Sequence, residues 1–505
     1  MYKDNKILIG KSENKELTML LNKLNRHGLI TGATGTGKTV SLKVIAESLS
    51  DAGIPVFLAD VKGDLAGLAF EGESNENIAS RLEGLKISDF EFKKYPVTLW
   101  DVFGENGHFT RATPSSIGSD VLSIMLGLNE TQEATLSIIF KVSEDEGLKL
   151  YDLKDLKKIL QYVSENKGEY TTKYGNITSQ TTGVILRSLL ALERSGADKF
   201  FGEPELDIND FIRTDNDGRG YINILDSREL YKTPDLYTSF MLWLLNSLFN
   251  KCPEVGDLDK PKMVFFFDEA HLLFDNMPSY RLKKITQVVK LIRSRGIGLF
   301  FISQTPLDIP GDILAQLGNK IQHALRAYTP SELKNLKAVA DSFRENPSFD
   351  TVDVLGNLKT GEALISFLND DGEPDIVERA TILPPQSLMG AIDDISRAKI
   401  INSSTLVGKY DEVIDNESAY EILTQKEEDK AKLIEEEKQK AIEEKEAEKK
   451  KKEEEKEAEK KKKEEEKEKQ RKSKKMERLG DRLVGNAAST VERKILNSVL
   501  KNIFK

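Results

Sequence analysis

Short apolar runs recur along the chain, and each of them ends in polar residues or a turn. The runs are "HGLIT" at 27–31, "PVFLAD" at 55–60, "VTLWD" at 97–101, "YINILD" at 221–226, "MVFFFDE" at 263–269, "GLFFIS" at 298–303 and "ALISFL" at 363–368. Runs that are apolar throughout predict strands covered on both faces, as in a parallel sheet. Helix-like stretches at 38–51, 235–249 and 280–294 separate many of these runs, and this alternation predicts an α/β layered domain.

The segment 111–205 lies between two of these runs and has a helical period instead. Apolar positions recur at helical spacing in "SSIGSDVLSIMLGLNETQEATLSIIF" and in "LYDLKDLKKILQYV". We therefore expect a helical insertion that completes the domain. The alternative is that the insertion forms part of a substrate or subunit surface.

The C-terminal region consists of a charged segment followed by a segment in which apolar residues return. Residues 426–475 are almost entirely Lys and Glu, and "KEAEKKKKEEE" occurs there twice in succession. Opposite charges four residues apart stabilise a helix by roughly 0.2–0.5 kcal/mol per pair, and the lack of an apolar stripe predicts a solvated single helix or semi-rigid spacer. Residues 476–505 recover an apolar face through Val484, Val491 and Ile495. We expect this face to dock on the chain itself or on a neighbouring subunit, with a membrane surface as the alternative.

The composition of the chain excludes several classes of protein. The chain has 505 residues, 39% of them hydrophobic, so it can bury a substantial core. Its net charge of −10 argues against a uniformly basic nucleic-acid coat but leaves room for a local basic channel. The single cysteine, Cys252, excludes an internal disulfide framework and a thiolate zinc cluster. With no signal peptide and no apolar segment near the ~20 residues that cross a bilayer, we expect a cytoplasmic protein.

The stretch "GATGTGKT" matches the phosphate-binding pattern G-x-x-x-x-G-K-[ST] at every fixed position. It lies between a predicted strand and a predicted helix, which is the context that the pattern needs. Its backbone N–H groups and the helix dipole favour phosphate, and we expect Lys38 to contact the β- and γ-phosphates and Thr39 to ligate magnesium. The nucleotide-binding residues predicted here are Gly32, Ala33, Thr34, Gly35, Thr36, Gly37, Lys38, Thr39 and Val40.

Two carboxylates follow the most apolar strand candidate, in "MVFFFDEAH". At the end of that strand, Asp268 can hold the magnesium shell and Glu269 can polarise the attacking water. A metabolic kinase transfers phosphate to a bound acceptor and has no need of a water-activating glutamate here. ATP hydrolysis is therefore the predicted chemistry.

Three further polar residues are candidates for the same site. Gln304 follows the run "GLFFIS" and would emerge near the γ-phosphate if that strand is a neighbour of the phosphate-binding strand. Arg293 and Arg295, in "KLIRSRGIG", are candidates to stabilise transition-state charge across a subunit boundary. The alternative for both arginines is a solvated helix end.

The order of these motifs resembles the HerA/FtsK superfamily of hexameric ATPases, and most closely the bacterial HerA-like ATPases of the HerA C-terminal-domain family. The phosphate loop, "LADVKGD", "FFFDEAH" and "RSRGIGLFFISQTP" carry the resemblance, which covers roughly residues 5–390 and the apolar tail near 478–505. The resemblance implies the roles given above for Lys38, Thr39, Asp268, Glu269 and Gln304.

The resemblance implies more than the motifs show by themselves. Asp60 and Asp64 match the acidic residues of a D-x-x-G-[DE] stretch near the nucleotide, so Asp60 joins the predicted nucleotide-binding residues. The implied protein is a ring motor, most often a hexamer, that hydrolyses ATP with Mg²⁺ and translocates or unwinds DNA. A protein partner such as a nuclease is compatible with it. HerA proteins carry an N-terminal β-barrel that contributes to partner docking, however, and a phosphate loop at Gly32 leaves no room for one.

We therefore expect an α/β fold with a RecA-like P-loop NTPase core, a mainly parallel sheet and additional helical parts. The expected core comprises residues 1–110, with the P-loop, and 206–390, with the hydrolysis and sensor residues. The other parts are the insertion at 111–205, a helical linker at 391–425, the charged spacer at 426–475 and an amphipathic C-terminal segment at 476–505.

Two other functions fit parts of the sequence. "TGTGKT" and "DEAH" resemble the first two motifs of superfamily 2 helicases, but no second strand-rich motor domain follows Pro385. The other rival is a nucleotide-gated oligomeric scaffold that recruits partner proteins without translocating DNA. A response of ATP hydrolysis to nucleic acid would distinguish a motor from such a scaffold.

Overall fold

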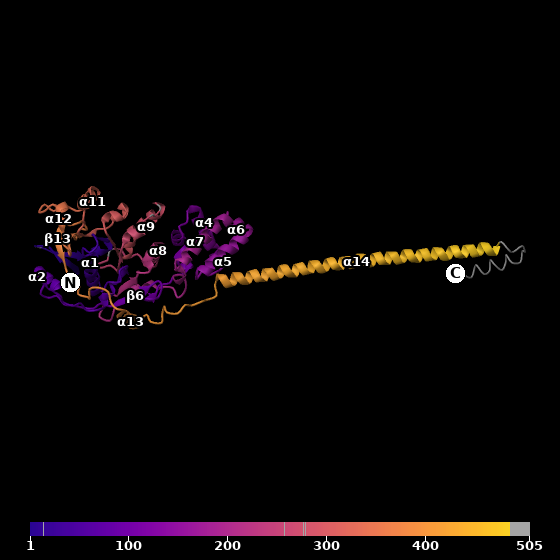
Figure 1. The fold of residues 1–505 in the computed structure, drawn as a ribbon, viewed down its shortest axis with the longest axis horizontal. Helices are drawn as coiled ribbons and strands as arrows, with labels where there is room; N and C mark the ends of the chain where they lie inside the picture. The colour runs from indigo at the N-terminus through magenta and orange to yellow at the C-terminus, as the bar shows by residue number, and fades with distance from the viewer. Residues whose placement is uncertain (14, 257, 276, 278, 485–505) are drawn as a thin grey trace. The chain divides into compact units, whose positions relative to one another are not determined.

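The computed structural model describes residues 1–484 except 14, 257, 276 and 278 (Figure 1). The chain divides into two compact units, which meet between Leu423 and Thr424. Within the described ranges, no helix is both long enough and apolar enough to cross a membrane.

A 13-stranded sheet forms the centre of the first unit. Its strands are β1 (Tyr2–Lys3), β2 (Lys6–Lys11), β3 (Glu16–Leu20), β4 (Gly28–Thr31), β5 (Val56–Asp60), β6 (Val97–Asp101), β7 (His108–Phe109), β8 (Ile222–Asp226), β9 (Met263–Phe267), β10 (Ile297–Ser303), β11 (Asn319–His323), β12 (Glu362–Ser366) and β13 (Glu378–Ile382). They lie in the order β1-β2-β13-β12-β11-β4-β10-β9-β5-β8-β6-β7, with β3 paired to β2.

The predicted parallel sheet is confirmed, and every apolar run forms one of its strands. All pairs from β11 to β7 are parallel, whereas β12, β13 and the N-terminal strands add an antiparallel edge. Sequence reasoning identified β12 but missed β13 and the N-terminal strands, because they are short and mix polar with apolar residues. In β2, for example, the burial alternates and one position is a bulge.

The central strands are apolar throughout because both faces of the sheet are covered. In β5, Phe57 packs into the core on one face, whereas Val56 and Leu58 pack into the core on the other. In β9, Phe265 and Phe266 likewise belong to opposite cores. Side chains of a strand alternate between faces, so a strand buried on both sides reads as a continuous apolar run.

The helices are α1 (Lys38–Asp51), α2 (Glu76–Leu85), α3 (Pro114–Met125), α4 (Glu130–Asp145), α5 (Leu153–Glu165), α6 (Lys167–Tyr174), α7 (Ser179–Arg194), α8 (Pro234–Lys251), α9 (Ser279–Ile292), α10 (Gly311–Leu314), α11 (Pro330–Ala340), α12 (Thr351–Asn357), α13 (Asp394–Asn402) and α14 (Ala419–Val484). The helical insertion is confirmed as α3 to α7, which share a core with α8 and α9 on one face of the sheet. α1 packs on the opposite face.

Capping residues explain where the insertion helices begin. Asn129 and Gln132 form a capping box at the start of α4, and Asp152 and Asp155 form another at the start of α5. Each box satisfies backbone N–H groups that the first turn leaves without partners. The helical stretch read from sequence is thereby divided into separate helices that fold back on one another.

The segment 384–420 returns across the first unit and is held by buried carboxylates (Figure 1). These carboxylates, each at most 9% exposed, are Glu47, Asp155, Asp210 and Asp226. Glu47 accepts hydrogen bonds from the N–H groups of Gln386, at 2.8 Å, and Ser387, at 3.0 Å. Burial raises the pKa of Glu47 to about 7.

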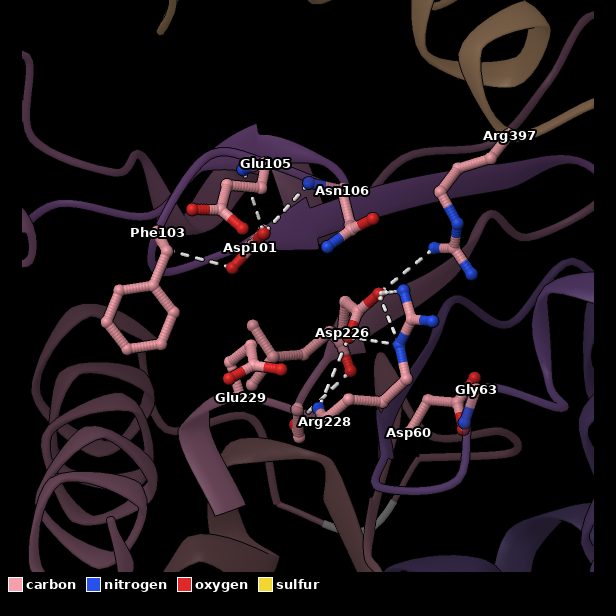
Figure 2. A network of polar contacts seen from close by, with 12 residues as sticks. Asp60, Gly63, Asp101, Phe103, Glu105, Asn106, Asp226, Arg228, Glu229 and Arg397 are labelled. Carbon is pink, nitrogen blue, oxygen red and sulfur yellow. Dashed lines mark hydrogen bonds and ion pairs between the residues drawn. The ribbon is translucent and has the colours of Figure 1, made fainter. Parts of the chain in front are cut away.

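Asp226, at the end of β8, connects this returning segment to the sheet (Figure 2). Its carboxylate is 3.2 Å from a guanidinium nitrogen of Arg397, on α13, and 2.6 Å from one of Arg228. Two guanidinium groups therefore compensate one buried carboxylate, which needs such pairing to be tolerated away from water.

The second unit continues α14 from residue 424 to 484. Side chains from 428 to 477 are exposed, and pairs such as Glu448 and Lys452, 2.7 Å apart, link successive turns. The predicted solvated single helix is confirmed. The predicted amphipathic face lies mostly outside the described residues, because it falls largely within 485–505.

Candidate active site

The predicted phosphate loop joins β4 to α1 and has the conformation that phosphate binding needs. Gly37 precedes the first residue of α1 with φ +119°, a left-handed conformation that favours glycine. Thr34 and Gly35 are exposed at the tip of the loop, whereas Gly32 and Thr36 are buried at its base. A loop of this form leaves backbone N–H groups free to face a phosphate.

Lys38 lies inside this loop. Its Nζ donates hydrogen bonds to the carbonyl oxygens of Gly32, at 2.5 Å, and Ala33, at 3.3 Å. Burial lowers the pKa of Lys38, and the positive charge of Lys62 lowers it further. The ammonium group is thus placed at the loop with only carbonyl oxygens as partners, and a phosphate could replace them.

The back of the loop rests on two residues that sequence reasoning missed. The N–H of Gly361 donates a hydrogen bond to the carbonyl oxygen of Thr36, at 3.0 Å. His323 is 3.0 Å through Nδ1 from the carbonyl oxygen of Glu362 and 2.9 Å through Nε2 from Ser41 Oγ. Burial lowers the pKa of His323 to about 4, so the ring is neutral, donates through Nδ1 and accepts the Ser41 hydroxyl. The position of His323 on β11, a strand that the pattern of apolar runs did not reveal, hid this role.

Asp268 and Glu269 follow β9, two strands from the phosphate-binding strand. Burial raises the pKa of Asp268 to about 7, and the neighbouring charge of Glu269 raises it further. Its main chain is fixed because Tyr237 donates a hydrogen bond to its carbonyl oxygen at 2.9 Å. A cation bound nearby would stabilise the charged form of this buried carboxyl group.

Glu269 has an unusual backbone and an unusual side-chain environment. Its φ of +48° is a left-handed conformation that non-glycine residues rarely adopt, and such strain is concentrated at functional sites. Its Oε2 is buried without a hydrogen-bond partner among the described residues, and His271 Nδ1 lies 3.4 Å away. This geometry leaves an acceptor available to a water molecule at the end of β9.

Gln304 directly follows β10, which pairs with both β4 and β9. Its carbonyl oxygen accepts a hydrogen bond from the N–H of Gly32, at 3.2 Å, and its side chain is exposed. The strand before Gln304, β10, is therefore a neighbour of the phosphate-binding strand β4, as its predicted sensor role requires.

Asp60 ends β5 and lies beside Gly63 of the loop that follows (Figure 2), and both of its carboxylate oxygens accept hydrogen bonds from that loop. They accept hydrogen bonds from the N–H groups of Gly63, at 2.6 Å, Asp64, at 3.2 Å, and Leu65, at 3.0 Å. Burial raises the pKa of Asp60 to about 6. These contacts give Asp60 the role of shaping the loop, and direct contact with a nucleotide stays a prediction.

The two candidate arginines lie in the single turn that follows α9, and they differ in their surroundings. Arg295 donates a hydrogen bond to the carbonyl oxygen of Cys252, at 2.6 Å, and is 3.6 Å from Glu254. The side chain of Arg293 makes no hydrogen bond or ion pair within the described part of the chain, and only its carbonyl oxygen accepts one, from the N–H of Gly296. The Arg293 side chain is therefore the less constrained of the two by its own chain.

Comparison with protein families gives one match across nearly the whole chain. The family described as Helicase HerA-like C-terminal matches residues 5–505. The match includes the phosphate loop, both carboxylates after β9 and Gln304.

Individual relatives have similar names. The chain is 24% identical over 376 residues to "DNA double-strand break repair helicase HerA" of Sulfolobus acidocaldarius, covering 71% of this chain and 66% of that protein. It is 25% identical over 385 residues to the protein of the same name from Sulfurisphaera tokodaii, covering 72% and 67%. The chain thus spans about two thirds of the length of these relatives.

A solved structure shows the same fold. Plasmid coupling protein TrwB, in complex with a non-hydrolysable GTP analogue, superposes with a TM-score of 0.51 at 12% identity. The superposition covers 77% of this chain and 91% of that one. At this identity the likeness supports the RecA-like P-loop architecture and nothing finer.

Proposed function

This chain belongs to the Helicase HerA-like C-terminal family, and on that premise we propose that it is a Mg²⁺-dependent ATPase and a ring-forming DNA translocase or helicase. The observation that carries the proposal is the convergence of Lys38, Gln304 and the pair Asp268–Glu269 at the carboxyl ends of neighbouring parallel strands. Ligands of open α/β sheets bind at that edge. The names of the relatives support DNA as the substrate.

The residues present fit both ATP and Mg²⁺. Magnesium is usually held by one or two carboxylates together with substrate phosphates and several waters. Thr39, in the first turn of α1, and Asp268 would supply a hydroxyl and a carboxylate, and both are oxygen donors of the kind that Mg²⁺ prefers. Bound Mg²⁺ would neutralise charge on the phosphates.

The chain's own groups then divide the chemistry between them. Lys38 would exchange its two carbonyl partners for phosphate oxygens. Glu269 would accept a hydrogen bond from the attacking water through its unpartnered Oε2. It would take up a proton as the water oxygen bonds to the terminal phosphorus and the bond from that phosphorus to the bridging oxygen of the leaving diphosphate breaks. Gln304, whose main chain is tied to Gly32, would sense the loss of the terminal phosphate.

Ring assembly is part of the proposal, with a hexamer as the expected form, because each chain contributes one motor core and a neighbour would complete its site. Arg293 is the first candidate for the residue donated to that neighbour. Mixing Lys38→Ala subunits with Arg293→Ala subunits, each inactive alone, should restore ATP hydrolysis, because some interfaces then combine an intact P-loop with an intact arginine. A mixture as inactive as its components, or a fully active monomer by light scattering, would refute sharing between subunits.

DNA binding in a central channel is the second part of the proposal. Adding DNA should stimulate ATP hydrolysis, and both binding and stimulation should fall steeply between ~50 and ~200 mM salt, because phosphate contacts release counterions. Filter binding and ATPase assays across this range would measure both effects. No DNA binding at low salt by the Glu269→Gln protein would defeat the translocase proposal and favour the nucleotide-gated scaffold.

The charged part of α14 supplies the matched control for the DNA experiment. Glutamates interleave with its lysines and offset their charge, so deletion of 426–475 should leave DNA-stimulated hydrolysis largely intact. Loss of stimulation in this variant would assign DNA binding to the spacer instead of the motor. A protein partner, such as a nuclease, is a further role that the spacer or the C-terminal segment could serve.

A further inference from the structure

Lys62 is a cation that the site contains in addition to Lys38. It lies in the loop after β5, its side chain is exposed, and it has no hydrogen bond or ion pair to any described residue. Lys154 and Lys232, by contrast, form ion pairs with nearby carboxylates. The charge of Lys62 is therefore available to a ligand that binds at this edge of the sheet.

The loop that carries Lys62 is rigid on both sides of it. Before Lys62, Asp60 holds the loop through three backbone N–H groups; after it, Leu65 is buried with 2% exposure. Gly63 adopts φ +78° and packs so closely on Arg228 that a Cβ at this position would lie 2.8 Å from Arg228 Cδ. Arg228 is fixed in turn by Asp226 (Figure 2). Lys62 is thus presented at a defined place.

That place is next to the hydrolysis residues. β5 pairs with β9, so the loop after β5 and Asp268 emerge side by side at the same edge of the sheet. β9 and β10 lie between β5 and the phosphate-binding strand, yet the charge of Lys62 acts on Lys38 as well as on Asp268. The strand order therefore brings this loop to the edge of the sheet at which the P-loop and the two carboxylates also emerge.

We propose that the Lys62 ammonium group binds the terminal phosphate of the bound nucleoside triphosphate. The proposal rests on the nucleotide site described above and identifies a second phosphate-binding cation in it. Lys38 approaches from the P-loop, and Lys62 approaches from the loop after β5. A triphosphate would thus be held from two elements of the sheet, whereas a diphosphate, which lacks the terminal group, would be held from the P-loop alone.

Replacing Lys62 by methionine tests this, because methionine keeps the length and flexibility of the side chain and removes only its charge. We expect Lys62→Met to weaken the affinity for a non-hydrolysable ATP analogue by about ten- to hundredfold, the range for one hydrogen bond to a charged group. Its affinity for ADP, measured in the same Mg²⁺ buffer by calorimetry, should stay within about twofold of wild type. Lys62→Arg, which keeps the charge, should recover part of the analogue affinity.

Lys94→Met is the matched control. Lys94 is equally exposed but precedes β6, so it lies at the opposite edge of the parallel sheet, and its replacement should change neither affinity. Equal losses for ADP and the ATP analogue in Lys62→Met, or no loss for either, would overturn the proposal. Failure of the wild-type protein to bind any nucleotide would refute the ATPase proposal itself, which is a distinct result.

Discussion

Replacement of Lys38 by alanine is expected to abolish ATP hydrolysis and to weaken nucleotide binding by at least about ten- to hundredfold. The Lys38 ammonium group is held 2.5 Å from the Gly32 carbonyl oxygen, and among the described residues its only hydrogen-bond partners are the carbonyl oxygens of Gly32 and Ala33. Alanine removes the one charge that this loop itself offers to the phosphates, and no other P-loop side chain carries one. Nucleotide affinity and steady-state hydrolysis would measure the two losses separately.

The unliganded Lys38→Ala protein should fold and melt like wild type. Burial lowers the pKa of Lys38, so the charged form of its side chain is less favourable in the folded protein than in water. Removing that charge should therefore not destabilise the fold. Lys38→Arg is the second control, because arginine keeps the charge but cannot take the place of a compact ammonium group. Normal turnover in Lys38→Ala would contradict the assignment of the P-loop.

Replacement of Glu269 by glutamine should have the opposite profile, with nucleotide binding retained and hydrolysis lowered by about 10²- to 10⁴-fold. Glutamine preserves the size of the side chain and can still occupy the buried position near His271, but it cannot accept a proton from water. Lys38, Thr39 and Asp268 are untouched, so the protein should accumulate bound ATP. Retention of radiolabelled ATP on a filter, with no release of phosphate, would detect this trapped state.

The same chemical change elsewhere serves as the control. Glu412 is exposed and carries no hydrogen bond or ion pair among the described residues, so Glu412→Gln should hydrolyse ATP at the wild-type rate. If Glu269→Gln also turns over at the wild-type rate, Glu269 is not the base. Loss of ATP binding in Glu269→Gln would instead show that the strained backbone at this position depends on the carboxylate.

Strands that are buried on both faces of the sheet could be predicted from the sequence, whereas strands that are partly exposed or contain polar residues could not. Strands such as β5 and β9 are covered on both faces, and their continuous apolar runs identified them correctly. β2 and β11 were not identified, because β2 is partly exposed at the sheet edge and β11 contains lysine, glutamine and histidine. Polar residues of β11 can be buried because they form specific hydrogen bonds, as His323 does. The pattern of hydrophobic residues along the chain does not predict such bonds.

The candidate site was predictable where a short motif contains all of its parts. The P-loop pattern includes the turn, the lysine and the start of the helix in one stretch, so its chemistry could be read directly. The family resemblance places Asp60 close to the nucleotide, which stays a prediction, but it gave no sign that the Asp60 oxygens accept hydrogen bonds from the backbone of their own loop. The direction of a carboxylate depends on which N–H groups the folded loop brings to it, and spacing along the chain does not determine that.

The order of residues along the chain was enough to predict the class of fold, the position of the phosphate loop, the two carboxylates after the most apolar strand and the helical nature of the charged spacer. All of these depend on neighbours in the chain, such as glycines in a turn, alternation along a strand or charges four residues apart. Three arrangements follow from the folded structure instead: the loop that carries Lys62 lies beside the end of β9, Arg295 binds its own chain, and Arg397 reaches Asp226. Those contacts join residues far apart in sequence. The positions of Lys62 and Arg397 depend on the strand order, which places the carboxyl ends of β5, β8 and β9 at one edge of the sheet, whereas Arg295 lies before β10, at the opposite edge.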